Sequence, residues 1–474
     1  MPDRLSILDA SFLFAENRTT AMHVGGVMTF LQPTDDPFDV AAFTSLIEER
    51  LHLVPRYRQK VRLVPGGLGL PVWVDDPDFD IHYHVRHSAL PAPGTDAMLR
   101  ELVGRLLVRH LDRSRPLWEV NVVEGLAGGR PGDGRTDEGG RERFAVVTKT
   151  HHAMVDGLAS MDIGAALLDL TPVPRPTPAQ VWRPTPEPSA IGLAAEATAD
   201  LLRRPWSVVE LAGEVAGRVV TDARSTADTV VRTVGGVLSA GRRAAAARPI
   251  AALNAATGQQ RRYGTLRTTL ADHRTVRKAH GGTVNDVVLA VVTGGLRRFM
   301  ISRGEPLTRT TQVRAMVPVS VRARARETGT ITPAGNNISA YLVDLPVVVD
   351  DPVERLEVLR QAMESHKRGG QAIGAATLIG LVGLAPPVLH SLGARMASKH
   401  SSNFYNVLVT NVPGPPRPLY AMGARMIDMY PVVPLGGQQA VAIGITSYDG
   451  HVHYGLTADR DAMPDVDELA EALA

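Results

Sequence analysis

The stretch FAVVTKTHHAMVDG, residues 144–157, decides how the chain folds locally and what chemistry it can carry. Its first seven residues are rich in β-branched side chains and predict a strand. From Gly157 onward apolar residues recur at three- and four-residue steps, which predicts a helix. We therefore expect His151 and His152 where a strand ends and successive side chains point to opposite sides. One imidazole can then face a cavity while its neighbour packs inward.

This pair of histidines is suited to moving a proton, because neutral imidazole near pH 7 can accept one from a hydroxyl group. Taken singly, a histidine pair is commonly a packing feature and Asp-Gly is a common turn. The complete string after a strand favours a catalytic base. We expect the carboxylate of Asp156 to support the loop by pairing with an arginine, of which Arg314 is one candidate, rather than to relay protons.

A metal site is the alternative reading of the histidines elsewhere in the chain. His82 and His84 lie in the pattern Ile-His-Tyr-His-Val, which predicts a strand with both imidazoles on one face. That arrangement could bind zinc. The chain has no cysteine and no second cluster at ligand spacing, so we favour packed or solvated histidines and expect no metal.

The composition is that of a soluble globular protein. Hydrophobic residues make up 44% of the chain and charged residues 21%, and 474 residues favour two domains over one. The formal net charge of +2 gives no field that would attract nucleic acid. The absence of cysteine fits a reducing compartment, and the N-terminus lacks the pattern of a signal peptide. We expect a cytoplasmic protein.

The order of strand-like and helical patterns predicts a mixed α/β protein with three parts. Residues 1–171 form a first domain with the histidine motif, residues 172–262 a proline-rich linker and an amphipathic helix, and residues 263–474 a second α/β domain. The charged, glycine-rich stretch 125–143 is expected to be a disordered hairpin loop.

Two apolar segments leave the relation to membranes open. Gly369–Ala394 has no charged residue and predicts two helices broken at Pro386-Pro387, either in the core or in contact with a bilayer. The helix predicted over 208–238 has an apolar side and a polar side of mixed sign. It suits packing at a domain junction or peripheral binding.

The sequence lacks the motifs of several common enzyme classes. It contains no G-x-S-x-G, no Walker-type phosphate loop and no H-E-x-x-H. A base without a nucleophile of its own suits direct transfer, in which a deprotonated acceptor attacks an activated acyl group such as a thioester. Asn285, at the start of a predicted helix, is either a donor to the developing oxyanion or a helix cap.

Several strings together make the chain resemble a known family. These are Leu5–Asp9, Pro116-Leu117-Trp118, His151–Gly157, Asn285-Asp286 and Asn411–Pro415. The histidine motif by itself is shared with carnitine and chloramphenicol-type acyltransferases, peptide-synthetase condensation domains and polyketide-associated acyltransferases. In combination, the strings resemble the bacterial wax ester synthase/acyl-CoA:diacylglycerol acyltransferases (WS/DGAT) over nearly the whole chain.

The resemblance implies two chloramphenicol-acetyltransferase-like domains with an active-site tunnel between them. It implies that His152 is the general base and His151 its supporting neighbour, and that Asp156 and Gly157 are structural. By the same resemblance, further residues support the active-site architecture: Asn285, Asp286, Pro116, Leu117 and Trp118.

The implied reaction moves a long-chain acyl group from acyl-CoA, a substrate and not a cofactor, to diacylglycerol or a fatty alcohol. The same resemblance implies peripheral contact with the inner membrane or with lipid droplets. A polyketide, sugar or peptide acceptor and a non-catalytic lipid-binding protein are the alternatives. Two departures, the insertion over 125–143 and Ala21 where proline is common, concern specificity rather than reaction type. Acceptor preference, acyl chain length and oligomeric state do not follow from the sequence.

Overall fold

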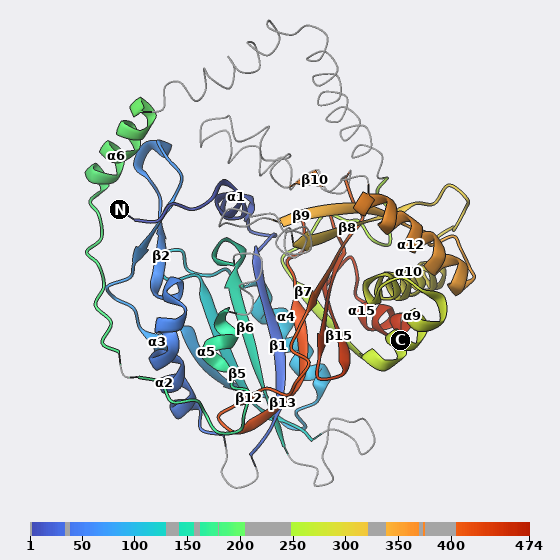
Figure 1. Ribbon diagram of the computed structural model, residues 1–474, viewed down its shortest axis with the longest axis horizontal. Coiled ribbons are helices and arrows are strands. Elements are labelled where there is room, and N and C mark those ends of the chain that lie inside the picture. The colour runs from blue at the N-terminus through green and yellow to red at the C-terminus, as the bar shows by residue number, and fades with distance from the viewer. Residues whose placement is uncertain are drawn as a thin grey trace, which may run out of the picture.

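A computed structural model describes most of the chain. Its described residues are 2–33, 38–128, 142–155, 162–178, 180–203, 248–320, 338–368, 373–374 and 404–474. Within them, two large sheets stand side by side, and helices α9, α10, α12 and α15 gather on the far side of the second sheet (Figure 1).

The first sheet has six strands in the order β12-β13-β1-β6-β5-β4. Neighbouring strands are antiparallel except for β4 and β5, which are parallel. Its strands are β1 (His23–Leu31), β4 (Val85–Ala89), β5 (Trp118–Leu126), β6 (Arg143–His151), β12 (Tyr420–Ala421) and β13 (Ala424–Val432). A separate ribbon is formed by β2 (Gln59–Arg62) and β3 (Val72–Asp75).

The second sheet has seven strands in the order β10-β9-β8-β11-β14-β15-β7. Here β11 runs parallel to both β8 and β14, and the other pairs are antiparallel. Its strands are β7 (Arg261–Thr269), β8 (Val313–Ser320), β9 (Ile338–Leu345), β10 (Ile373–Gly374), β11 (Val407–Pro413), β14 (Val441–Tyr448) and β15 (His451–Asp459).

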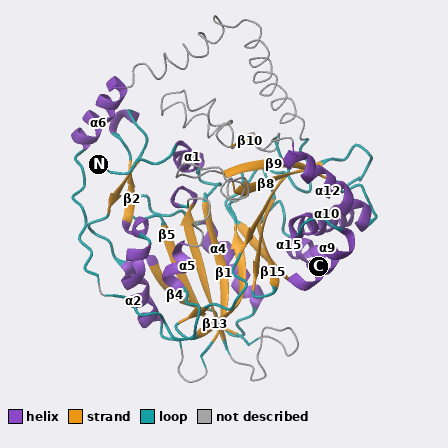
Figure 2. Ribbon diagram, in the orientation of Figure 1, coloured by secondary structure: helices purple, strands orange, loops and turns teal. Residues whose placement is uncertain are grey.

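Helices connect and cover these strands (Figure 2). The α-helices are α1 (Ile7–Ala15), α2 (Val40–Arg50), α3 (Ile81–His84), α4 (Asp96–Val108), α5 (Asp162–Leu167), α6 (Ala190–Arg203), α9 (Leu270–His280), α10 (Val284–Ser302), α12 (Pro352–Arg368) and α15 (Val466–Leu473). Short 3-10 turns are η1 (Leu51–Leu53), η2 (Pro55–Arg58), η3 (Pro65–Gly67) and η4 (His152–Met154).

Strand β6 lies at the centre of the first sheet and is buried along its whole length. One face of this sheet packs on the cluster that contains Phe43 and Ile47 of α2. The other face packs on α4, whose Leu99 and Val103 share a cluster with Tyr263 of β7. Helix α4 therefore joins the two sheets. Because β6 is held from both faces and by both neighbours, its last residue has a well-defined position.

The two sheets do not follow the order of the chain. Strands β12 and β13 come from the C-terminal part, yet β13 pairs with β1 and completes the first sheet. Residues 420–432 thus cross over from the second sheet to the first. The domain boundaries that we predicted at residues 171 and 262 did not take this crossing into account. Those boundaries remain a prediction.

Most strands and helices lie where their sequence patterns predicted them. The strand expected before His151 is β6, and the helix expected to begin near Asn285 is α10. Asp449 and Gly450, both at positive φ, form the predicted turn between β14 and β15.

One element was predicted wrongly. Ile81–His84 is a single helical turn and not a strand, because Asp80 caps it by accepting the amide of His82 at 2.9 Å. His82 is exposed whereas His84 is buried, so the two imidazoles do not share a face.

Several predictions fall on residues outside the described part of the chain. These are Asp156 and Gly157, the helix over 208–238, most of the loop 125–143 and nearly all of 369–394. Among the helices that the structure does describe, none combines the length and the apolar character needed to cross a bilayer.

Candidate active site

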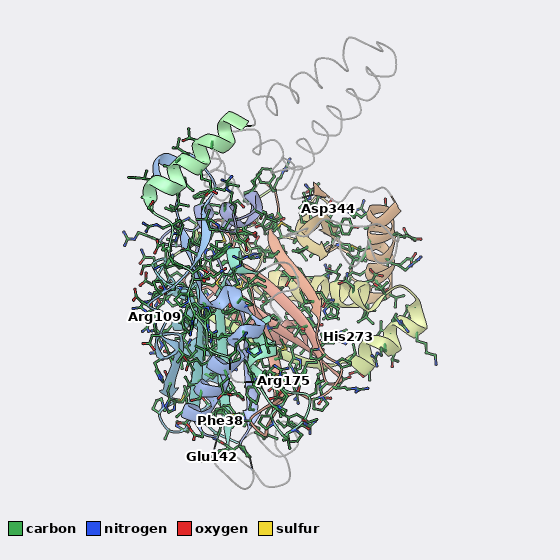
Figure 3. The ribbon with its side chains drawn as sticks, turned by 60° about the vertical axis from the view of Figure 1, so that its left-hand side comes forward. Phe38, Arg109, Glu142, Arg175, His273 and Asp344 are labelled. Atoms are coloured by element: carbon green, nitrogen blue, oxygen red, sulfur yellow. The ribbon has the colours of Figure 1, made fainter. Side chains whose placement is uncertain are left out.

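The backbone of the histidine pair is held by the two strands that flank β6. The amide of His151 donates to the carbonyl of Leu117 at 2.9 Å, and the amide of His152 donates to that of Met22 at 2.8 Å. At this end of the sheet α1 lies across the strand ends in Figure 1, and it contacts η4. The opposite end, where Phe38 and Glu142 are labelled in Figure 3, lies far from the pair.

His151 packs inward, as the alternation at the strand end predicted. Its side chain is 1% exposed, and its Nδ1 accepts the amide N–H of Ala153 at 3.0 Å. Burial lowers the pKa of His151 to about 3, and the positive charge of Arg113 contributes. This imidazole is therefore neutral at physiological pH.

His152 lies on the first residue of η4 and is only partly buried. Its ring stacks on Phe12 of α1, with ring centroids 3.9 Å apart and planes inclined by 24°. Burial lowers the pKa of His152 to about 4, although a backbone hydrogen bond acts in the opposite direction and raises it. The ring is thus neutral, and its Nδ1 is buried without a hydrogen-bond partner.

Residues that sequence reasoning missed surround His151. The carboxylate Oε1 of Glu16 lies 3.5 Å from Nε2 of His23 and 3.8 Å from Nε2 of His151. Burial and the charge of Lys149 hold the pKa of His23 well below its usual value. The motif Met22-His23 was visible in the sequence, but nothing in it indicated that the β1–β6 register places His23 opposite His151.

Pro116, Leu117 and Trp118 support the site through β5. All three are buried, and the carbonyl of Leu117 fixes the backbone of His151. The indole of Trp118 donates to the carbonyl of Tyr57 at 2.7 Å and stacks on His84 at 4.5 Å.

His84 is a packed core histidine rather than a metal ligand. Its Nδ1 bonds the carbonyl of Trp118 at 2.8 Å, and burial lowers the pKa of His84 to about 4. No group of three or more histidine or acidic side chains suited to a metal ion occurs among the described residues.

Asn285 and Asp286 have different roles at the start of α10. The cap is Thr283, whose hydroxyl accepts the amide of Asp286 at 3.2 Å while the Asp286 carboxylate accepts the Thr283 amide at 2.7 Å. The alternative that Asn285 caps the helix is therefore wrong. Its Oδ1 instead accepts a hydrogen bond from the side-chain Nδ2 of Asn411 at 3.0 Å.

The pair Asn285–Asn411 brings together two of the strings noted in the sequence. Among the described residues, neither a hydrogen bond nor a ring contact joins this pair to either histidine of the motif. Arg314, which we considered as a partner for Asp156, forms an ion pair with Asp344 at 2.6 Å. Asp156 itself lies outside the described part of the chain.

The two-sheet fold is similar to that of structurally characterised acyltransferases. The trichothecene 15-O-acetyltransferase TRI3 of Fusarium sporotrichioides superimposes with a TM-score of 0.57, covering 99% of this chain and 94% of that one. The identity is 11%, so this likeness concerns the fold.

Closer similarity defines the family. Residues 5–288 match the model for the wax ester synthase/diacylglycerol acyltransferase catalytic domain, and residues 334–474 match the WS/DGAT C-terminal domain. The chain belongs to the wax ester synthase/diacylglycerol acyltransferase family and is an acyltransferase.

Relatives of known name agree with this. A Mycobacterium tuberculosis protein named "Probable diacyglycerol O-acyltransferase tgs1" is 33% identical over 99% of this chain and 94% of its own length. The structure of the wax ester synthase/diacylglycerol acyltransferase from Marinobacter aquaeolei VT8 has a TM-score of 0.67 at 27% identity. That match covers 99% of this chain and 97% of the Marinobacter chain.

Proposed function

We propose that this acyltransferase moves a long-chain acyl group from acyl-CoA to the hydroxyl of a diacylglycerol or a fatty alcohol, with His152 as the general base. The observation that carries the proposal is the setting of His152, which is neutral, partly exposed and fixed at the end of β6. Only a neutral imidazole can accept the hydroxyl proton.

The proposed step needs no covalent acyl-enzyme. The acceptor oxygen loses its proton to His152 and attacks the thioester carbonyl, forming a tetrahedral intermediate. The C–S bond then breaks, the ester carbonyl re-forms, and the imidazolium returns its proton to the departing CoA thiolate. A thiol leaves readily because its pKa of about 8.5 lies far below that of an alcohol.

Other residues have supporting parts in this proposal. Asn285 is a candidate donor to the oxyanion, since its Oδ1 accepts from Asn411 while its Nδ2 makes no hydrogen bond among the described residues. We assign Asp156, Gly157 and Asp286 structural roles, and Asp286 completes the capping box of α10 with Thr283. The proposal involves no cofactor or metal.

The test compares His152→Ala with His82→Ala, which removes an exposed histidine of α3. Radiolabelled acyl-CoA is offered with dioleoylglycerol, hexadecanol or a carrier-bound thioester as acceptor. We expect triacylglycerol or wax ester from the wild type, a loss of about 1000-fold in His152→Ala, and no change in His82→Ala. Retention of most activity in His152→Ala would reject the base, and transfer only to the carrier-bound acceptor would reject the substrate class.

We also propose peripheral contact with a membrane or lipid droplet, which supplies the apolar acceptor. Five aliphatic side chains on the linker, on α6 and near β2 support it because each is more than 60% exposed: Leu63, Leu170, Val173, Val181 and Ile191. Leu63 and Ile191 belong to neighbouring segments, since α6 packs on η3 beyond β2.

Flotation with phosphatidylglycerol vesicles tests this surface. The double variant Leu63→Ser/Ile191→Ser should float less than the wild type. The control Val276→Ser, on the exposed side of α9, should float equally well. Equal flotation of both variants would place membrane contact elsewhere.

A further inference from the structure

Helix α1 and the residue that caps its C-terminal end face both histidines of the motif. Phe12 stacks on the ring of His152, and Glu16, four residues later, faces His151. Residues four apart lie on the same side of a helix, and the amide of Glu16 still donates to the carbonyl of Phe12 at 3.2 Å. One short helix and its C-cap residue therefore lie against both histidine side chains.

The carboxylate of Glu16 is buried and held from several directions. Its side chain is 4% exposed, and Arg113 donates to Oε2 at 2.7 Å. The amide of Met22 donates to Oε1 at 3.4 Å, and the same oxygen is the one that faces the Nε2 atoms of His23 and His151. A carboxylate removed from water in this way needs donors on both oxygens.

The hydrogen bonds of His151 determine which tautomer it adopts. Because Nδ1 accepts the amide of Ala153, the proton of the neutral ring resides on Nε2. This Nε2 is buried and has no hydrogen-bond partner within 3.5 Å, and it is directed to Glu16. The ring thus lies between the turn η4, which carries His152, and the carboxylate of α1.

We propose that Glu16 is a positioning residue for catalysis, which holds His151 in the Nε2–H tautomer and thereby fixes the turn that carries His152. The inference rests on the proposed role of His152 as base. Loss of the carboxylate lets the His151 ring turn over, which breaks its bond to Ala153 and loosens residues 152–154. Phe12 fixes the ring of His152 from the same helix.

Glu16→Gln is the sharpest variant because it keeps the size of the side chain. The single amide oxygen of glutamine goes to Arg113, the closest donor, so the NH2 group is turned to the histidines. Two donors then face each other, which favours the Nδ1–H tautomer of His151. We expect kcat to fall about 10- to 100-fold with the KM for acyl-CoA within twofold of the wild type.

Two matched variants separate positioning from general stability. Glu49→Gln makes the same chemical change on an exposed residue of α2 and should leave kcat unchanged. Arg113→Met removes the half-exposed ion-pair partner of Glu16 but keeps the carboxylate, so it should lower kcat less than Glu16→Gln does. If Glu16 and Arg113 were only a structural tie, both variants would reduce stability and kcat equally.

The tautomer of His151 can be observed directly in histidine-15N-labelled protein, assigned with a His151→Asn variant. We expect an Nε2–H imidazole in the wild type and in Glu49→Gln, and an Nδ1–H imidazole in Glu16→Gln. An unchanged tautomer, or a Glu16→Gln enzyme as active as Glu49→Gln, would overturn the inference. Neither result bears on the proposed role of His152 as the general base. That role is rejected only if the His152→Ala variant stays active.

Discussion

Two buried clusters of similar composition lie near opposite ends of β1, and only one of them includes a histidine of the motif. Near His23, the Glu16 carboxylate meets Arg113 and two histidines. Near Thr29, a second buried carboxylate, Asp428, meets Arg267 at 3.3 Å and His453 at 3.4 Å. Both clusters join a carboxylate, an arginine and a buried imidazole with a lowered pKa.

The surroundings of the two clusters differ. His453 is fully buried, and Tyr430 packs edge-on against its ring at 5.1 Å. Asp428 of β13 receives donors from Thr29 of β1 and Arg267 of β7, so it ties the first sheet to the second. His151 is equally buried but is followed at once by the partly exposed His152. Burial and charge alone therefore do not distinguish the two clusters, whereas the adjoining His152 does.

The largest difference is expected when each carboxylate is neutralised. Asp428→Asn should destabilise the fold by about 3 kcal/mol, because Arg267 and His453 lose a buried charge partner. The kcat of the folded fraction should stay at the wild-type value. Denaturant unfolding and activity per folded molecule check this, with Asp350→Asn, at 89% side-chain exposure, as a control that should change neither. A loss of kcat like that of Glu16→Gln would show that the clusters are functionally alike.

Much of the fold could be predicted from the sequence because local patterns encode it. The β-branched run before His151 and the three- to four-residue spacing after Val284 each have one reading, and both elements formed as expected. The pattern over Ile81–His84 has two readings. Alternation suggested a strand, but the cap at Asp80 and the stacking of His84 between Phe79 and Trp118 stabilise a helical turn.

The Glu16 cluster could not be predicted, because it depends on pairings between distant segments. Glu16 and His151 meet only once α1 packs on η4 and β1 aligns with β6 in the observed register. The pairing of β13 with β1 is a similar case, since the sequence pattern of a strand does not indicate which strand it pairs with. The identities of His151 and His152 were readable from the motif, but the residues that orient them were not.

A smaller effect is expected when activity is measured as a function of pH. The pKa of His152 is lowered to about 4, so kcat/KM should be flat between pH 8 and pH 5. A base with the ordinary histidine pKa of about 6.5 would instead lose about nine tenths of its activity at pH 5.5. A loss of that size in the wild type, with the protein still folded, would contradict the lowered pKa.

Stability should respond to pH in a different range from activity. His84 and His151 have folded pKa values of about 4 and about 3, below the unfolded value of about 6.5. Above pH 6.5 both states hold these rings neutral, so stability is constant there. As pH falls below 6.5 the unfolded chain takes up protons that the folded chain refuses, which costs up to about 1.4 kcal/mol per pH unit for each ring. Unfolding at pH 7.5 and pH 5.5 should therefore show a loss of stability without a loss of kcat/KM, because the unfolded chain takes up protons in this range while the folded His152 stays neutral.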